Sequence, residues 1–321
     1  MKVLYIHGER RLPGQAGGAE SLLRDQAEGM KRAGHECAWW YGQGSIGDAI
    51  REYQPDVCHL MTTHCYPMGM QPAIYLQQNN IPHIWHVQDY WQFCASRMMM
   101  IGDKSCTVCH NECEQYANPE YRRITDKSFI VAGNKYTADI YRNNGCRCDA
   151  VVELGVDVDL FHPEVKYDPP TIYTSRSILA GSWKGTHLID RALQGTDYQC
   201  LVISGLPRER VAEELSHGSI FLFTSLYQET FGLSLCEAMS CGCACISFDV
   251  AGAKAQLEDG DTGILIPTGD VQALREKVNM LIADPECRIM LGKNAREHVI
   301  KDHSLEAMTQ RWLQVYNEVT R

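Results

Sequence analysis

The stretch SIFLFTSLYQETFGLSLCEAMSCGCACISFD, residues 219–249, contains an apolar run, a polar loop, a helical segment and a second run of small and apolar residues. The two runs have the length and composition of buried strands, and residues 232–241 have the length of a helix that connects them. Two strands joined through a helix lie parallel, because a parallel pair needs a long connection between its ends. The stretch therefore predicts one strand–helix–strand unit of a parallel sheet.

Strands and helices alternate in the same way along most of the chain. Further strand-like runs are KVLYIH, CAWWY, DVCHL, HIWHV, SFIVAG and DAVVEL in the first half, and TIYTS, QCLVIS and GILIP in the second. Residues 19–34 have the apolar stripe of an amphipathic helix, and helical segments separate the other runs. This order predicts an α/β protein with two Rossmann-like, doubly wound parallel sheets.

A proline-containing segment divides the two series. Residues 155–170, GVDVDLFHPEVKYDPP, carry three prolines and little apolar periodicity, which favours a linker. We expect an N-terminal domain at 1–160, a C-terminal domain at 161–302, and a closing helix at 303–321 that packs back toward the N-terminal domain. Ligands of doubly wound folds bind at the carboxyl ends of the strands, so we expect a site between the two domains.

Composition and charge exclude several classes of protein. The chain has 321 residues, of which 45% are hydrophobic and 22% charged, as in a folded globular protein. Its net charge of −10 argues against a wide, sequence-independent grip on nucleic acid. No apolar run approaches the length of a membrane span, and the first residues resemble a strand, not a signal peptide. Fifteen cysteines without an export signal indicate a reducing compartment, so we expect a cytoplasmic protein.

Two glutamates stand eight positions apart in the first stretch quoted above. Glu229 precedes the predicted helix and Glu237 lies in its second turn, so both carboxylates can face one side. They are either solvated surface groups or acceptors for the hydroxyls of a sugar and a ribose, and the flanking apolar strands favour the second role. The glycine-rich loop GQAGGAE at 14–20, which opens the first helix, suits a bound anion or is a plain flexible turn.

Several motifs together resemble the family 4 retaining glycosyltransferases, which have the GT-B fold of two Rossmann-like domains. ETFGLSLCEAMSCG is similar to the family's E-x7-E signature, and VAGAKAQLEDGDTGILIP at 250–267 resembles the segment that follows it. GVDVDLFHP at 155–163 and GGAE at 17–20 match two further motifs. PDVCHL at 55–60 and QDYWQFC at 88–94 resemble the subgroup with an HDYWxxC segment.

The resemblance implies a role for each residue of a donor site. Glu229 would bind hydroxyls of the donor sugar, and Glu237 the ribose of its nucleotide. Lys184 would neutralise the diphosphate with Arg176, which lies eight residues earlier, further than in the family pattern. The other donor-binding positions are Gly17 and Gly18 in the first glycine loop, and Thr230, Phe231, Gly232 and Leu233 before the helix. With backbone dipoles and a lysine at the diphosphate, no Mg²⁺ or Mn²⁺ should be required.

The chain also departs from the family pattern. Gln88 and Met61 stand where the family has histidines, and Ala255 stands where it has a glutamate. Gln88 keeps a hydrogen-bond donor and acceptor but cannot take a proton. Either His86, on the same strand face, or His64 could replace the missing histidine, or each could be structural. The candidate catalytic residues are Glu229, Lys184, Gln88 and His86.

The implied reaction is retaining transfer of a sugar from a nucleotide diphosphate donor, such as a UDP- or GDP-sugar, to an acceptor hydroxyl. The acceptor is open: a glycan, a lipid-linked intermediate, a small molecule or a modified nucleic-acid base. Two alternatives remain. The chain could be a GT-B phosphorylase or hydrolase. It could also be a sugar-nucleotide-binding protein with reduced catalysis, an alternative that the departures from the family pattern favour.

A Cys- and Met-rich loop interrupts the alternation between about residues 90 and 115. It contains Cys94, Cys106, Cys109 and Cys113, with a CxxC at the centre. A long loop outside regular structure needs something to order it, and four thiolates can hold a structural Zn²⁺. An Fe–S cluster and reduced, packed cysteines are the alternatives. The motif DVD at 157–159 has the form of an Asp-x-Asp metal site, but it lies within the linker pattern, and we interpret it as structural.

Overall fold

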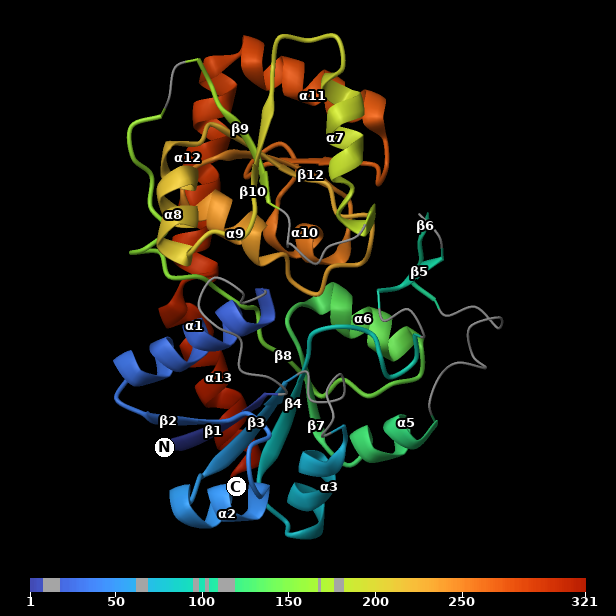
Figure 1. Ribbon diagram of the computed structural model, residues 1–321, viewed down its shortest axis with the longest axis vertical. Coiled ribbons are helices and arrows are strands. Elements are labelled where there is room, and N and C mark those ends of the chain that lie inside the picture. The colour runs from blue at the N-terminus through green and yellow to red at the C-terminus, as the bar shows by residue number, and fades with distance from the viewer. Residues whose placement is uncertain are drawn as a thin grey trace.

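The computed structural model describes residues 1–7, 18–61, 69–94, 98–101, 104–108, 119–166, 169–175 and 182–321. These residues form two lobes, one above the other in Figure 1, with a parallel sheet at the centre of each. The N-terminal sheet lies in the lower lobe, where both chain termini are found. The predicted fold class, an α/β protein with two parallel sheets, is confirmed.

The N-terminal sheet has six parallel strands in the order β2-β1-β3-β4-β7-β8. In that order they are Glu36–Trp40, Lys2–His7, Val57–Met61, His83–Val87, Phe129–Ala132 and Ala150–Val151. The helices of this half are α1 (Gly18–Arg32), α2 (Ile46–Tyr53), α3 (Gln71–Gln78), α5 (Pro119–Thr125) and α6 (Lys135–Asn143). Successive strand residues face opposite sides: Tyr5 packs with α1, while Leu4 packs with α3 and α6.

The C-terminal sheet has five parallel strands in the order β10-β9-β11-β12-β13. In that order they are Cys200–Ile203, Ile172–Ser175, Ile220–Phe223, Ala244–Phe248 and Ile264–Ile266. Its helices are α7 (Thr186–Leu193), α8 (Arg208–His217), α9 (Leu233–Ser240), α10 (Ala251–Gln256), α11 (Val271–Ala283) and α12 (Pro285–Asp302). The quoted stretch is the unit β11–α9–β12, and β11 and β12 pair in parallel as predicted.

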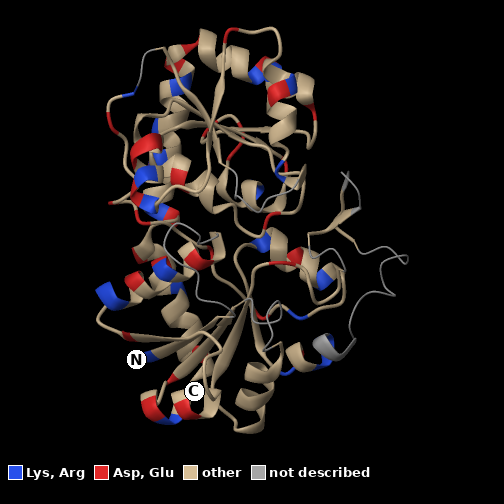
Figure 2. Cartoon of the chain, in the orientation of Figure 1, with Lys and Arg blue, Asp and Glu red and all other residues tan. Residues whose placement is uncertain are grey.

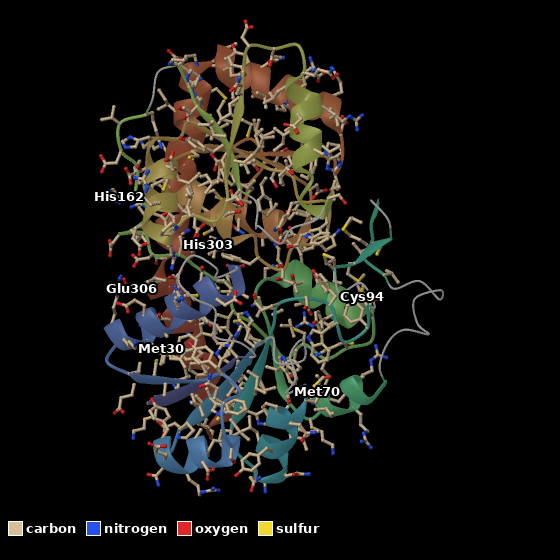
Figure 3. The ribbon with its side chains drawn as sticks, viewed as in Figure 1. Met30, Met70, Cys94, His162, His303 and Glu306 are labelled. Atoms are coloured by element: carbon tan, nitrogen blue, oxygen red, sulfur yellow. The ribbon has the colours of Figure 1, made fainter. Side chains whose placement is uncertain are left out.

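The chain crosses between the lobes twice. The first crossing follows β8 and includes the predicted domain division between residues 160 and 161; the second joins α12 to α13 (Leu305–Val319). The two crossings meet where Val156 N–H donates to the carbonyl of His303 at 2.8 Å, and Figure 3 labels His303 at this place. Helix α13 then lies on the lower sheet, with Tyr316 OH 2.6 Å from Nδ1 of His59.

The DVD motif has the structural role that we expected. Asp157 accepts the N–H of Asp159 at 3.1 Å and pairs with Arg32 of α1 at 2.7 Å. Asp159 lies 3.5 Å from the same guanidinium. The motif therefore fixes the first crossing to α1.

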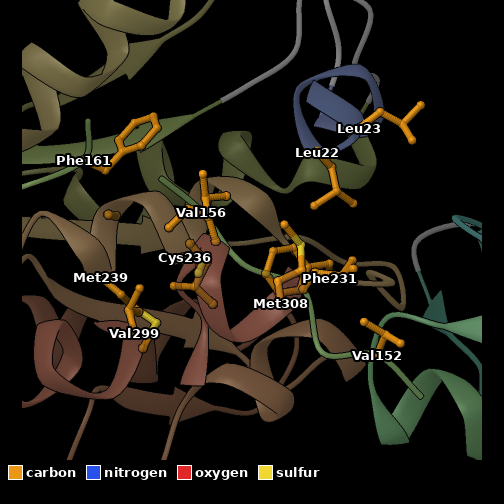
Figure 4. Packing of buried hydrophobic residues seen from close by; sticks show 14 of the residues in the cluster. Leu22, Leu23, Val152, Val156, Phe161, Phe231, Cys236, Met239, Val299 and Met308 are labelled. Atoms are coloured by element: carbon orange, nitrogen blue, oxygen red, sulfur yellow. The ribbon is translucent and has the colours of Figure 1, made fainter. Parts of the chain in front are cut away.

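One apolar cluster continues from the lower lobe into the upper. Figure 4 shows Leu22 of α1, Phe231 before α9 and Met308 of α13 among its members, and all three are buried. Helices α1 and α13 touch so closely that a Cβ on Gly29 would lie 2.1 Å from Thr309 Oγ1. The boundary between the lobes is therefore part of the hydrophobic core, and it holds the surrounding polar groups in fixed positions.

The structure differs from the expected elements in two places. DAVVEL was predicted as one strand, but only Ala150–Val151 pairs with β7, because the following residues leave the sheet to begin the first crossing. The Cys- and Met-rich loop contains a short antiparallel hairpin, β5 (Met100–Ile101) with β6 (Lys104–Ser105). Two-residue strands are too short to show an alternating pattern. Gln228 donates to Ser105 Oγ at 2.6 Å, so the hairpin is tied to the upper lobe.

Charged side chains mostly avoid the two sheets. Figure 2 shows Lys, Arg, Asp and Glu chiefly on the helices and loops, with both signs intermixed. None of the helices in the described part of the chain combines the length and apolar character that a membrane span requires. Among the described Lys, Arg, Asp and Glu residues, three are buried: Asp25, Glu229 and Glu237.

Candidate active site

The loop between β11 and α9, residues 224–232, lies at the carboxyl end of the upper sheet, on the side of the lower lobe (Figure 1). Its last residue, Gly232, has φ +90°, a conformation that L side chains rarely adopt. A Cβ at this position would also lie 2.9 Å from Phe223 Cζ. Glycine therefore lets the chain turn sharply into α9, whose N-terminus, at Leu233, carries the positive end of the helix dipole.

The carboxylate of Glu229 is the centre of a buried polar cluster. Oε1 accepts from Ser225 Oγ at 2.6 Å and from the ammonium of Lys184, and Oε2 accepts from Tyr227 OH at 2.5 Å. Burial and the charge of Glu229 raise the pKa of Tyr227 well above its usual range, so the phenol stays protonated and donates. We predicted Glu229 and Lys184 as separate donor contacts; the structure joins them in one ion pair.

The local backbone explains why a lysine and a glycine stand together here. Lys184 ends a short 3-10 helix, and its carbonyl accepts from Thr224 Oγ1 at 3.0 Å. Gly185 has φ +65°, and a Cβ there would lie 2.0 Å from the carbonyl oxygen of Thr224. This close contact brings the lysine to Glu229. The side chain of Lys184 is 23% exposed and that of Glu229 is 9% exposed, so the ammonium is the more accessible of the two charges.

Glu237 belongs to a different cluster. Its Oε1 lies 3.9 Å from Nε of Arg208, the first residue of α8. The two terminal nitrogens of Arg208 donate to the two carboxylate oxygens of Asp25 on α1, across the boundary between the lobes. Burial raises the pKa of Glu237 to about 8; Arg208 opposes this shift and Asp25 adds to it. The two glutamates of the motif therefore lie in two distinct polar clusters.

Gln88 and His86 lie at the end of β4 in the lower lobe. The amide Nε2 of Gln88 is 2.9 Å from Nε2 of His86, so the imidazole accepts from the amide. His86 is fully buried, with its ring centroid 4.9 Å from that of Trp312. Burial lowers the pKa of His86 to about 3, so this side chain is neutral near pH 7.

Thr230 makes polar contacts between the two lobes through both its side chain and its backbone. Its hydroxyl donates to the carbonyl of Gln88 at 2.9 Å, and its own carbonyl accepts from Asn134 Nδ2 and, at 3.5 Å, from Thr137 Oγ1. Nearby, a Cβ on Gly18 would lie 4.0 Å from Cβ of Leu233, so the starts of α1 and α9 face each other. Of the predicted donor-binding positions, Gly18 of the lower lobe thus lies close to Leu233 of the upper lobe.

Phe231 contributes its side chain to the core, not to an open surface, since it is buried in the cluster of Figure 4. Its carbonyl accepts from the amide of Gln256 on α10, which also donates to the carbonyl of Gly252 at 3.2 Å. A Cβ on Gly252 would lie 2.3 Å from the Phe231 carbonyl oxygen. Helix α10 therefore packs against this loop and fixes its backbone at Phe231.

Several predicted residues lie outside the described residues: Gly17, Arg176, Cys109, Cys113 and His64. Of the proposed zinc ligands, Cys94 is buried beside α6 (Figure 3) and Cys106 is half-buried after β6. Within the described ranges, no group of three or more His, Cys, Asp or Glu side chains is placed to hold a metal ion. These ranges include only two of the four predicted ligands, so the zinc site stays a prediction.

Four residues of these clusters were not predicted from the sequence: Tyr227, Ser225, Arg208 and Asp25. Asp25 could have been noticed, because it is an acidic residue among the buried positions of α1. Arg208 gives a weaker signal: a basic residue in the first turn of a helix is unfavourable for the dipole, which suggests a tertiary partner. Tyr227 and Ser225 precede Glu229 closely, but nothing in their spacing indicates that they donate to it.

Part of the chain is similar to a known protein family. Residues 176–298 match the family model of glycosyl transferases group 1. N-acetyl-alpha-D-glucosaminyl L-malate synthase of Bacillus anthracis is 34% identical over 114 residues, which are 36% of this chain and 30% of that protein. The chain therefore matches less than a third of that relative's length.

Solved structures resemble the whole chain. HepE of Anabaena, crystallised with UDP and glucose, aligns with a TM-score of 0.72 at 16% identity, over 99% of this chain and 100% of that one. Sucrose-phosphate synthase of Thermosynechococcus elongatus aligns with a TM-score of 0.78 at 16% identity, over 99% and 98%. The predicted GT-B fold is thereby confirmed. The chain has this fold along its whole length, and its residues 176–298 are similar to the glycosyl transferases of group 1.

Proposed function

We propose that this chain is a retaining glycosyltransferase that moves a sugar from a nucleotide diphosphate donor to an acceptor hydroxyl. The observation that carries the proposal is the ion pair between Lys184, at the end of a 3-10 helix, and Glu229, on the loop that leads into α9. An ammonium and a helix N-terminus suit an anionic leaving group, and a carboxylate suits sugar hydroxyls. The similarity of residues 176–298 to glycosyl transferases group 1 supports glycosyl transfer.

Lys184 would stabilise the charge that develops on the departing diphosphate. Because its ammonium is the more exposed partner, it can turn from Glu229 toward a bound phosphate. Glu229 would keep Ser225 and Tyr227 as donors and gain a free lone pair for a sugar hydroxyl. With Lys184 and the α9 dipole at the diphosphate, the reaction needs no Mg²⁺ or Mn²⁺ in this proposal.

Retention of this kind does not require a strong base from the protein. In the mechanism we propose, a leaving phosphate oxygen takes the acceptor proton on the face from which it departs. His86 supports this, because it is fully buried and a weak base, with a pKa near 3. Gln88 would position the substrates by hydrogen bonds, held by His86 on one side and by Thr230 on the other.

The donor would bind between the lobes. Its proposed contacts are Gly17, Gly18, Arg176, Lys184, Glu229, Thr230, Phe231, Gly232, Leu233 and Glu237. HepE was crystallised with UDP and with UDP-glucose, which makes UDP-sugars the first donors to test and GDP-sugars the next. Membership of family 4 and of its HDYWxxC subgroup, the acceptor, and a cytoplasmic location remain predictions.

Two alanine variants should separate the roles of the two glutamates. Above about pH 8, where Glu237 is a carboxylate, Glu237→Ala should weaken binding of the nucleoside diphosphate about 10- to 100-fold, because losing a hydrogen bond to a charged group costs roughly 1.5–3 kcal/mol. Glu229→Ala should bind the nucleoside diphosphate nearly as well as the wild type but use the intact donor less well by a similar factor. Calorimetric titration and release of nucleoside diphosphate measure the two effects.

Glu297→Ala is the matched control, since Glu297 is an exposed glutamate on α12 whose carboxylate is paired with Lys293. If both site variants fold, bind and turn over donor like this control, the assignment is wrong. Product analysis with and without phosphate and acceptor separates glycosyl transfer from the phosphorylase and hydrolase alternatives. Donor binding without any turnover would favour the sugar-nucleotide-binding alternative.

We also propose a structural Zn²⁺ held by Cys94, Cys106, Cys109 and Cys113. Cys94 N–H donates to the carbonyl of Tyr90 at 2.8 Å, and Cys106 N–H donates to that of Met99 at 2.9 Å, so the backbone of both outer ligands is fixed. An ion closed by four thiolates would hold the segment between them beside Asp89 and Trp91, on the acceptor side.

Protein purified without chelator should contain about one zinc per chain, in line with a closed four-ligand site. Cys106→Ser should lose the metal, and Cys287→Ser should keep it, because Cys287 is a half-buried cysteine on α12, far along the chain from the loop. Elemental analysis by mass spectrometry measures this. Fully folded, active wild-type protein without metal would end the proposal, and iron with acid-labile sulfide would point to a cluster.

A further inference from the structure

Three charged side chains from two lobes meet in the interior. Asp25 belongs to α1, Arg208 to α8 and Glu237 to α9. Their side chains are 4%, 18% and 9% exposed, respectively. A buried charge is costly unless it is paired, and two carboxylates here share one guanidinium. The cluster therefore has to be held in a specific arrangement.

Asp25 fixes the orientation of Arg208. Nη1 and Nη2 of the guanidinium donate to Oδ1 and Oδ2 of Asp25, the two-point geometry that sets a guanidinium plane. The guanidinium carbon also lies 5.1 Å from the centroid of the Phe161 ring, in the linker. The position of Arg208 is thus fixed by Asp25 of the opposite lobe and by Phe161 of the linker.

The third guanidinium nitrogen of Arg208, Nε, lies near Glu237. Nε is buried and has no acceptor among the residues that the structure describes, and it lies 3.9 Å from Oε1 of Glu237. That separation is too long for a hydrogen bond but within the range of an ion pair. The cation therefore attracts the carboxylate, and neither carboxylate oxygen accepts a hydrogen bond from another residue that the structure describes.

Other charges around Glu237 are few. Arg208 and Asp25 are the groups that act on its pKa besides burial, and Asp157 of the linker acts on Arg208 and Asp25 in turn. On the other side of α9, Arg296 of α12 donates to the carbonyls of Phe161 and Ser240. Since burial favours the protonated form of Glu237, Arg208 is the group that favours the carboxylate.

We propose that Arg208 is a positioning residue whose cation beside Glu237 favours the carboxylate form that accepts from the ribose hydroxyls of the donor, and that Asp25 of the other lobe holds Arg208 in that place. The inference rests on the proposed function, in which Glu237 binds the ribose. It adds that the ribose site is complete only when α1 of the N-terminal lobe lies against α8.

Paired nucleotides test the idea. UDP and 2′-deoxy-UDP differ in one ribose hydroxyl, so the ratio of their affinities reports on Glu237 and cancels general effects on the site. We expect the wild type to prefer UDP by about tenfold at pH 8.5, the value of one good hydrogen bond to a charged group. The preference should grow with pH through about 8, where Glu237 ionises.

In Arg208→Gln the preference should fall to about onefold at pH 8.5 and return only at higher pH, because the cation that favours ionisation is gone. Arg208→Lys should retain part of it. Glu237→Gln should show a small preference that does not depend on pH. The double variant Asp25→Asn/Arg208→Gln leaves no unpaired buried aspartate, so it replaces the single variant in the experiment if Arg208→Gln does not fold. Its preference for UDP should be the same as that of Arg208→Gln.

The measurement is calorimetric titration between pH 6.5 and 9.5, repeated with GDP and 2′-deoxy-GDP if UDP does not bind. A wild type that binds neither ribonucleotide would overturn the proposed function and this inference with it. A wild-type preference that persists unchanged in folded Arg208→Gln, at every pH, would overturn the inference alone. Equal weakening of both nucleotides would show that Arg208 is merely structural.

Discussion

Replacing Lys184 by methionine should lower kcat for sugar transfer about 10²- to 10³-fold, the usual effect of removing one preorganised group that stabilises charge in the transition state. Methionine keeps the length of the stem and removes only the ammonium. Because Lys184 is paired with Glu229 in the free chain and would act on the diphosphate during reaction, the loss should appear in kcat more than in KM. Release of nucleoside diphosphate under saturating donor measures it.

The same substitution leaves the buried carboxylate of Glu229 without its cation, which should destabilise the fold. The double variant Lys184→Met/Glu229→Gln removes that unpaired charge, so its stability should recover while its activity does not. Lys293→Met is the matched control, because Lys293 is an exposed lysine also paired with a glutamate. A folded Lys184→Met enzyme with the kcat of this control would show that another group stabilises the leaving diphosphate.

Gly185→Ala should have the largest effect on stability, lowering the free energy of unfolding of the C-terminal domain by about 2–5 kcal/mol. A left-handed backbone costs a residue with a Cβ roughly 1–2 kcal/mol, and overpacking adds about 1–3 kcal/mol. Here φ is +65°, and the added Cβ would lie 2.0 Å from the carbonyl oxygen of Thr224, which is backbone and cannot swing away. Urea unfolding followed by circular dichroism measures the loss.

Gly195→Ala separates the two contributions. Gly195 also has a positive φ, +79°, but nothing lies within 4 Å of the Cβ position. Gly195→Ala should therefore lower the free energy of unfolding only by the cost of the left-handed backbone, about 1–2 kcal/mol. If Gly185→Ala is no less stable than Gly195→Ala, then the contact that delivers Lys184 to Glu229 is looser than the structure indicates.

The alternating strand and helix pattern predicted the fold well because each element carries its own signal. HIWHV was predicted as a strand over residues 83–87, and β4 spans His83–Val87. The prediction for the segment DAVVEL was wrong in its second half for a tertiary reason: Val152 and Leu154 are as apolar as strand residues, but they are buried where the chain crosses between the lobes. Hydrophobicity reports burial, and it does not distinguish these two ways of being buried.

The candidate site was predictable where it depends on local backbone geometry. The glycine before α9 and the lysine–glycine pair are required by positive φ angles and close contacts, so they appear as motifs in the sequence. The partners of the charged groups were not predictable, because Asp25 and Arg208 are 183 residues apart and meet only through packing of the lobes. Likewise, the pairing of Lys184 with Glu229 spans 45 residues of sequence.

The central claim is that the space between the two lobes binds a nucleotide diphosphate sugar, and a thermal-shift panel tests it most directly. A ligand that binds only the native state at 100 times its Kd stabilises it by about 2.7 kcal/mol, enough to raise Tm by several degrees. We predict that at least one UDP- or GDP-sugar raises Tm of the wild type, and that the rise is smaller in Glu237→Ala. A folded wild-type chain whose Tm is unchanged by every nucleotide sugar at millimolar concentration would contradict the claim.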